Sequence, residues 1–165
     1  MPAGKGTRER LIETAMELIW RNSYGSVSVD EICKTADVKK GSFYHFFPSK
    51  ADLAVAAMEQ YYNDSTYIFD DIFDRSRAPM ERFQKLVTLI LKHQKETAKK
   101  YGHVCGCPFA SLGSEMAGQD ELIRECVNST MNKYKSTYYE SAIKDMVHDG
   151  LIDPETNIKT KAQEV

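Results

Sequence analysis

Apolar residues recur along the chain at spacings of three and four, which is the period of an amphipathic α-helix, and strand-like alternation is scarce. The first such segment is predicted to be capped by Thr7 and to end within residues 22–26. Its predicted buried stripe consists of Leu11, Ile12, Ala15, Met16, Ile19 and Trp20. Ser28 and Glu31 have the spacing of a capping box, so a second short helix is predicted to follow Ser28. The pattern therefore predicts an all-α protein.

Residues 36–38 are predicted to form a tight turn, and a third short helix is predicted to follow it. On a helical wheel of about 100° per residue, Phe43, Phe46 and Phe47 share one face, which we expect to be buried. The opposite face and its flanks carry small and hydrogen-bonding groups, preceded by two lysines. These outward positions are Lys39, Lys40, Gly41, Ser42, Tyr44 and His45.

The same helical period continues through the rest of the chain and predicts five further helices. Their predicted starts are Ser49 (which has Asp52 three residues on), Pro79, Pro108, Asp120 and Asp153-Pro154. The helix from Pro79 is predicted to present Phe83, Leu86, Val87, Ile90 and Leu91 on one face. The helix from Asp120 is predicted to continue to Gly150. The softest boundary lies near residues 46–50, which predicts an N-terminal domain over 1–48 and a second helical domain over 49–165.

Composition limits the possible classes of protein. The chain has 165 residues, of which 42% are hydrophobic, and no apolar run is long enough to span a bilayer. The N-terminus lacks the apolar block of a secretory signal, so we expect a cytoplasmic protein whose four cysteines remain thiols. Residues 1–50 contain eight Lys and Arg against six Asp and Glu, which leaves room for a basic face there.

Two helices joined by a tight turn, the second with a small, polar and basic face, are suited to the DNA major groove. Gly41 would let the backbones approach closely, and Lys40 would bond guanine acceptors. Free N–H groups at helix starts, near Ser28 and Lys50, would bind phosphates. The candidate DNA contacts are Ser28, Lys39, Lys40, Gly41, Ser42, Tyr44, His45 and Lys50. From the residues alone, a helical connector with a solvated polar face is the alternative.

Residues 26–53, SVSVDEICKTADVKKGSFYHFFPSKADL, resemble the N-terminal signature of the TetR family of bacterial transcriptional repressors. The resemblance rests on the capped second helix, the Ala36–Val38 turn, the Gly41–Tyr44 run and the Ser49-Lys50 helix start. Three positions depart from the family pattern. Asp37 replaces a turn glycine, Lys39 replaces a serine or threonine cap, and Phe46 stands where histidine is frequent.

The resemblance implies a homodimer whose two recognition helices enter successive major grooves of a pseudo-palindromic operator. It also implies a C-terminal pocket in which a small-molecule effector changes the spacing of the two DNA-binding heads. Family dimers usually pair through their last two helices, and in this chain the predicted eighth helix barely begins. The implied function is that of a ligand- or redox-responsive transcriptional regulator, most simply a repressor.

The stretch YGHVCGCPFASLGSEM, residues 101–116, offers several chemistries. His103, Cys105 and Cys107 alternate, so an extended loop would bring them together on a soft metal ion. Cys107 precedes Pro108 at a helix start, where free N–H groups favour a reactive thiolate that senses oxidants or electrophiles. The third interpretation is a small buried residue that seats the helix. Some family members carry a similar pattern, matched here by Gly106-Cys107, Leu112 and Glu115.

Aromatic and methionine residues on the later helices are candidates for an effector pocket, although at helical spacing such residues are more often core. With Cys105 and Cys107, the candidates are Tyr61, Tyr62, Phe83, His93, Phe109, Met116, Tyr134 and Tyr138. No glycine-rich phosphate loop and no catalytic motif of the common hydrolases occurs, so we expect no enzyme, no cofactor and no metal. Two alternatives remain: a thiol enzyme that pairs Cys105 or Cys107 with His93 or His103, and a helical interaction module without DNA affinity.

Overall fold

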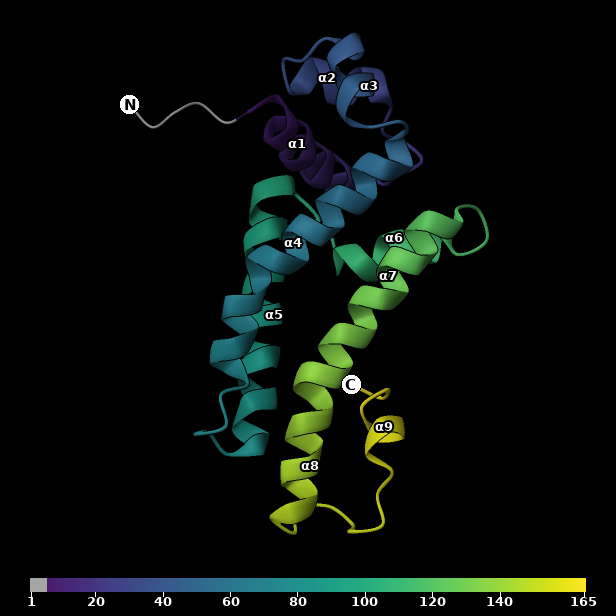
Figure 1. The fold of residues 1–165 in the computed structure, drawn as a ribbon. Coiled ribbons are helices and arrows are strands. Elements are labelled where there is room, and N and C mark those ends of the chain that lie inside the picture. Colours follow the sequence, from purple (N-terminus) through teal and green to yellow (C-terminus); the bar gives the residue numbers. More distant parts are fainter. Residues whose placement is uncertain (1–5) are drawn as a thin grey trace. The chain divides into compact units, whose positions relative to one another are not determined.

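The computed structural model describes residues 6–165, which are helical with no strand among them, so the predicted all-α class is confirmed (Figure 1). The helices are α1 (Thr7–Arg21), α2 (Val29–Thr35), α3 (Lys40–Phe46), α4 (Lys50–Ile72), α5 (Pro79–Tyr101), α6 (Pro108–Met116), α7 (Glu121–Tyr134), the π-helical turn η1 (Lys135–Tyr139), α8 (Glu140–His148) and α9 (Ile158–Lys161). Within these residues no helix is long and apolar enough to cross a membrane.

Local capping chemistry explains where the first helices begin. The Ser28 hydroxyl accepts the Glu31 N–H at 3.1 Å, so the predicted cap of α2 is confirmed. Ser49 accepts the Asp52 N–H at 3.2 Å and donates its hydroxyl proton to the Asp52 carboxylate at 2.6 Å. The predicted Thr7 cap is wrong: Thr7 is the first helical residue, and Gly6 holds the cap position without a side chain.

The turn between α2 and α3 depends on one residue in the left-handed region. Asp37 has φ 52°, a conformation that aspartate tolerates better than most residues other than glycine. The Asp37 N–H donates to Lys34 O at 3.3 Å and the Val38 N–H to Cys33 O at 2.9 Å. These are the two bonds of a Schellman motif, which satisfies the last carbonyl groups of α2. The turn brings α3 back against α1 and α2.

The chain divides into two compact units. One comprises the chain up to Asn63 together with Cys105–Asn128, and the other comprises Asp64–Val104 together with Ser129–Val165. The first unit therefore contains α1, α2 and α3 with the first part of α4, all of α6 and the first part of α7. Helices α4 and α7 contribute residues to both units.

The core of the first unit gathers apolar residues from α1 to α4. Its members are Leu11, Ile12, Ala15, Leu18, Val27, Ile32, Cys33, Ala36, Phe43, Phe47, Leu53 and Ala57. Phe43 is fully buried, and the Phe47 ring lies 6.1 Å from it. The expectation that Phe46 joins them is wrong, because its side chain is 39% exposed. Helix α3 ends at Phe46, and the extended backbone of Phe47 turns that ring inward while Phe46 remains at the edge.

In the second unit, an aromatic cluster lies around the π-helical turn. The Phe69 ring lies 4.5 Å from Tyr134 and 5.4 Å from Tyr138, and Phe73 lies 5.7 Å from Tyr139. A π turn inserts one residue into the helical repeat, so Tyr138 and Tyr139 both reach this cluster. The predicted helix over 120–150 is therefore confirmed, with a π-helical interruption that the periodicity did not reveal.

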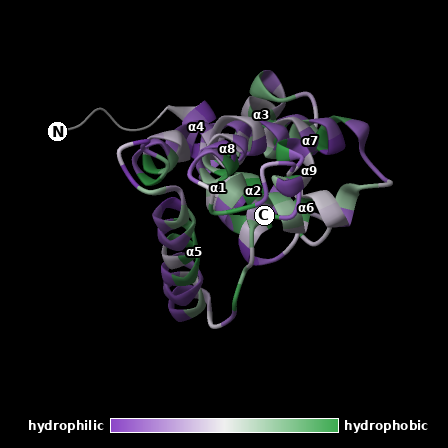
Figure 2. Cartoon of the chain, turned by 90° about the horizontal axis from the view of Figure 1, so that it is seen from below, coloured by the Kyte–Doolittle hydropathy of each residue, from purple (hydrophilic) through white to green (hydrophobic). Residues whose placement is uncertain are grey.

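The helix predicted from Pro79 is confirmed as α5, whereas the predicted start of the last helix is wrong. Only part of the predicted face of α5 is covered by the described residues: Leu86 is buried, whereas Val87, Ile90 and Leu91 are about half exposed. Figure 2 shows this helix with hydrophobic and hydrophilic positions side by side. The last helix does not start at Asp153-Pro154. It begins at Ile158, where the Asn157 side chain accepts the Thr160 N–H at 3.0 Å, and it spans four residues.

Candidate nucleic-acid interface

Helix α3 presents the polar face that its sequence predicts. Phe43 anchors the helix in the core, whereas Gly41 and His45 are exposed and Tyr44 is 52% exposed. Ser42 lies half-buried at the flank. The structure thus brings these predicted contact residues together on one seven-residue helix. Nothing lies within 4 Å of the position where a Cβ on Gly41 would stand, so this part of the face is open to close approach.

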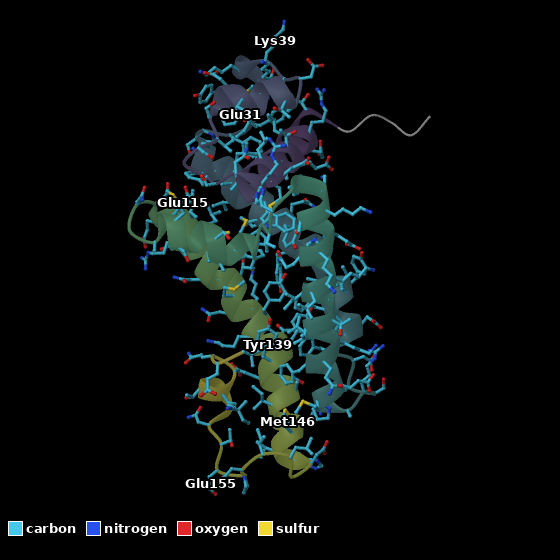
Figure 3. The ribbon with its side chains drawn as sticks, turned by 180° about the vertical axis from the view of Figure 1, so that it is seen from behind. Glu31, Lys39, Glu115, Tyr139, Met146 and Glu155 are labelled. Carbon is cyan, nitrogen blue, oxygen red and sulfur yellow. The ribbon has the colours of Figure 1, made fainter. Side chains whose placement is uncertain are left out.

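Two lysines stand at the N-terminal end of α3. Lys39 occupies the cap position without a side-chain cap bond, and its side chain points outward (Figure 3). Lys40 forms an ion pair with Asp30 of α2, with 2.8 Å between Nζ and the carboxylate. The hydrogen bond to Asp30 raises the pKa of the Lys40 ammonium. Both side chains are more than half exposed, so a phosphate can replace Asp30 as the partner of Lys40 at small cost.

Lys50, which the sequence predicts as a phosphate contact, has partners within the protein. Its ammonium donates to Tyr24 O and to Val27 O, each at 2.9 Å, and lies 3.9 Å from the centre of the Tyr24 ring. Burial lowers the pKa of Lys50, while the charge of Glu115 opposes that shift. A Lys50–phosphate contact stays a prediction. What the structure shows is a lysine that holds the turn between α1 and α2.

Sequence reasoning gave no role to Glu115, the residue that holds the other side of the same turn. Its carboxylate accepts the Tyr24 N–H at 2.9 Å and the Gly25 N–H at 2.6 Å. Glu115 lies ninety residues away in the chain, so no local pattern could have paired it with this turn. The only signal was its place in the pattern that begins at Gly106-Cys107.

The cysteines of residues 101–116 differ in exposure. Cys107 is exposed at the cap of α6, with Pro108 as the first helical residue, and Cys105 is half-buried. The interpretation of Cys107 as a buried residue is therefore wrong. All four cysteines are thiols in the described chain. Among residues 6–165, no three His, Cys, Asp or Glu side chains are grouped in a way that would hold a metal ion.

The predicted effector-pocket residues fall into both compact units. In the first unit the Tyr61 ring lies 5.8 Å from Phe109 and 6.2 Å from Trp20, Met116 is buried, and Tyr62 is half-buried. In the second unit Tyr134 bonds Ser65 through its hydroxyl at 2.7 Å, and the Tyr138 hydroxyl donates to Asp70 at 2.7 Å. Phe83 lies 5.8 Å from Phe73, and His93 is half-buried. A pocket formed by these residues stays a prediction.

Comparison with known proteins identifies the helix-turn-helix region. Residues 11–57 match the family described as bacterial regulatory proteins, tetR family. These residues belong to the TetR family. The match covers most of α1, all of α2 and α3, and the start of α4, the elements that position the exposed face of α3.

Relatives of known name extend this likeness beyond the N-terminal region. The transcriptional regulator AcuR of Cereibacter sphaeroides is 33% identical over 135 residues, which cover 81% of this chain and 60% of AcuR. The transcriptional repressor NemR of Escherichia coli is 27% identical over 125 residues, which cover 74% of this chain and 60% of NemR. The chain thus spans about three fifths of the length of these two regulators.

Solved structures agree with the fold. A TetR regulatory protein from Rhodobacter sphaeroides superposes with a TM-score of 0.82 at 27% identity, covering 94% of this chain and 80% of that one. The reduced form of E. coli NemR superposes with a TM-score of 0.80 at 23% identity, covering 95% of this chain and 79% of that one. The likeness to NemR at this identity is a likeness of fold.

Proposed function

We propose that this protein is a transcriptional regulator, most simply a repressor, that binds a pseudo-palindromic DNA operator as a homodimer. The observation that carries the proposal is the exposed face of α3, in which Gly41, Tyr44 and His45 project from a helix anchored by the buried Phe43. The similarity to AcuR and NemR, which are named as a transcriptional regulator and a transcriptional repressor, supports it. A regulator of this kind acts on DNA in the cytoplasm.

In this proposal the contacts divide into two classes. Lys40, Ser42 and His45 face base edges, with Tyr44 at a thymine methyl or a phosphate. Lys39 and the start of α2 at Ser28 face phosphates, which fix the position of the head without reading sequence. Two copies would place their α3 helices about 34 Å apart, in successive major grooves on one side of the duplex.

The test is selection of genomic fragments by the purified protein, followed by sequencing and titration of the enriched duplex. We expect an inverted repeat, and an affinity that falls steeply with salt because each neutralised phosphate releases counterions. His45→Ala should lower discrimination between the selected duplex and a scrambled one. Lys99→Ala, on an exposed turn of α5, is the matched surface control. Failure to enrich any duplex at low salt would refute the proposal.

We further propose that the regulator responds to an effector, and two arrangements support different effector classes. The buried aromatic rings around Tyr134 and Tyr138 suit an apolar or aromatic small molecule. The exposed thiol of Cys107 at the start of α6 suits an oxidant or electrophile.

Alkylation separates the two effector classes. Iodoacetamide, in which the cysteine sulfur displaces iodide, should weaken operator binding by the wild-type protein and leave Cys107→Ser unaffected if the thiol is the sensor. Cys105→Ser is the matched control, because its thiol is half-buried two residues away. Equal responses of wild type and Cys107→Ser would refute sensing at Cys107 and leave the aromatic residues as the candidate effector site. A thiol enzyme would instead show turnover that is lost in Cys107→Ser.

A further inference from the structure

The turn between α1 and α2 receives an anionic side chain on its N–H groups. The Glu115 carboxylate accepts the N–H of Tyr24 at 2.9 Å and the N–H of Gly25 at 2.6 Å. Hydrogen bonds to an ionised acceptor are shorter and stronger than neutral ones. Glu115 lies near the end of α6, so these two bonds connect α6 to the loop from which α2 starts.

Gly25 permits this contact. A Cβ on Gly25 would lie 2.9 Å from a Glu115 carboxylate oxygen, which is closer than real Cβ atoms come to their neighbours. The backbone of Gly25 is outside the left-handed region, so alanine is compatible with its conformation. An alanine at this position would therefore act mainly by pushing the carboxylate away from the two N–H groups.

A cation holds the carbonyl groups of the same turn. Lys50, at the start of α4, donates to Tyr24 O and Val27 O at 2.9 Å, and its ammonium lies over the Tyr24 ring. We call Glu115, Lys50 and the turn residues Tyr24–Val27 the turn clamp. The residue after Val27 is Ser28, which caps α2, and α2 packs against α3. The turn clamp therefore sets where α2 begins and, through α2, how α3 is presented.

The other end of α6 is also tied to α1. The Trp20 indole N–H donates to Gly106 O at 3.0 Å, just before the Cys107 cap of α6. Both ends of this nine-residue helix are thus bonded to α1 or to the turn that follows it. A displacement of α6 along or away from α1 must break one of these bonds or carry the turn with it.

We propose that Glu115 is a positioning residue for DNA binding, which holds the start of α2 through the turn clamp and so fixes how the recognition helix is presented. The inference rests on the proposed function, since it assigns a role in DNA binding to a residue outside the proposed DNA contacts. DNA binding would then depend on more than the DNA-contact residues. The recognition helix would be presented correctly only while the Glu115 carboxylate accepts hydrogen bonds from the Tyr24 and Gly25 N–H groups.

The experiment compares Glu115→Ala, Gly25→Ala and the double variant in fluorescence-anisotropy titrations on the selected operator, with active fractions determined by stoichiometric titration. Each single variant should bind the operator about tenfold more weakly, because charge-assisted hydrogen bonds are lost. The double variant should be no weaker than Glu115→Ala, because both changes break the same contact. Glu115→Gln, which keeps one acceptor oxygen, should be intermediate. Glu59→Ala, on an exposed turn of α4, is the matched control.

Amide hydrogen exchange gives a readout that does not depend on DNA. The Tyr24 and Gly25 amides should exchange faster in Glu115→Ala than in wild type, while the amides of the α3 core around Phe43 keep their protection. The emission of Trp20, the single tryptophan of the chain, monitors the bond at the other end of α6. Gly25→Ala keeps the test decisive if Glu115→Ala does not fold, since it leaves the glutamate in place.

The outcomes separate this inference from the proposed function. If wild type selects and binds a duplex while Glu115→Ala and Gly25→Ala bind it equally well, Glu115 is a structural contact only and the inference is refuted. Additive losses in the double variant would refute it as well. If wild type binds no duplex, the proposed function itself has failed, and the role of Glu115 in DNA binding falls with it.

Discussion

Two ion pairs of nearly equal length have opposite surroundings in this protein. Lys40 and Asp30 lie 2.8 Å apart in the helix-turn-helix region, with their side chains 52% and 73% exposed. Arg82 and Asp145 lie 2.7 Å apart between α5 and α8, with their side chains 3% and 17% exposed. The two distances are nearly equal and the burial is not, so solvent access decides whether a charge pair stabilises the fold or remains available to a partner.

The number of hydrogen bonds separates the two pairs in the same way. Arg82 also donates to Arg77 O from two of its nitrogens, at 3.0 and 2.9 Å, and to Arg75 O at 3.3 Å. A buried guanidinium is tolerated because these donors are satisfied. Lys40 has one carboxylate partner and open solvent, so a base edge or phosphate can replace Asp30.

The largest expected effect is that of removing the buried cation. Arg82→Ala leaves Asp145 without its buried partner and should lower the free energy of unfolding by about 3–5 kcal/mol. Arg75→Ala removes the exposed partner of the same carboxylate, 2.9 Å away, and should cost less than about 1 kcal/mol. Urea unfolding monitored by circular dichroism measures both. Equal losses in the two variants would contradict the distinction drawn from burial.

A smaller effect on stability is expected from a change of pH. Burial of Asp145 raises its pKa, but the hydrogen bonds from Arg82 and Arg75 outweigh this and place it below the ordinary value of 3.8. A carboxyl group with a lowered pKa stabilises the folded state above its unfolded pKa, and this contribution is lost as the pH falls through the folded value. The stability gap between wild type and Asp145→Asn should therefore be full at pH 7 and narrow below about pH 4. A gap that stays constant down to pH 3 would contradict this assignment.

For the exposed pair, we expect a mutation to affect discrimination between DNA duplexes more than the free energy of unfolding. Lys40→Ala should reduce discrimination between the operator and a mismatched duplex by about 1–3 kcal/mol, because a base contact is lost. Competition gel shifts with the two duplexes measure this difference, and the unfolding free energy should stay within about 0.5 kcal/mol of wild type. A large loss of stability without a change in discrimination would assign Lys40 to the fold.

The smallest effect is expected from the partner of Lys40. Asp30→Asn removes a negative charge close to the proposed phosphate contacts, and it releases the Lys40 ammonium from its ion pair. The affinity for the duplex should therefore rise slightly, by about 0.2–1 kcal/mol. The rise should be smaller when Lys40 is alanine, because the aspartate then has no lysine to hold and only the loss of its negative charge remains. Anisotropy titrations of the single and double variants at low salt test this coupling, and an equal rise in both backgrounds would contradict it.

Signals that lie within a few residues of each other determined much of this protein from the sequence alone. Ser28 and Glu31 specify the start of α2, Asp37 accommodates the left-handed turn, and Phe43 specifies the buried side of α3. Each depends on backbone geometry or helical period, which act over one or two turns. The exposed face of α3 follows from the same short segment. The same rules wrongly predicted that Phe46 is buried and that Thr7 caps the first helix. At a helix end, an error of one residue in the boundary changes which side chain is buried and which residue is the cap.

Only the tertiary structure decided what the charged and aromatic side chains far from this segment contact. Lys50 donates to the carbonyl groups of Tyr24 and Val27, and Glu115 reaches a turn ninety residues away. Arg82 finds Asp145 across sixty-three residues. A charged side chain pairs with whatever the fold places beside it, and the sequence spacing of the partners carries no information about that neighbourhood.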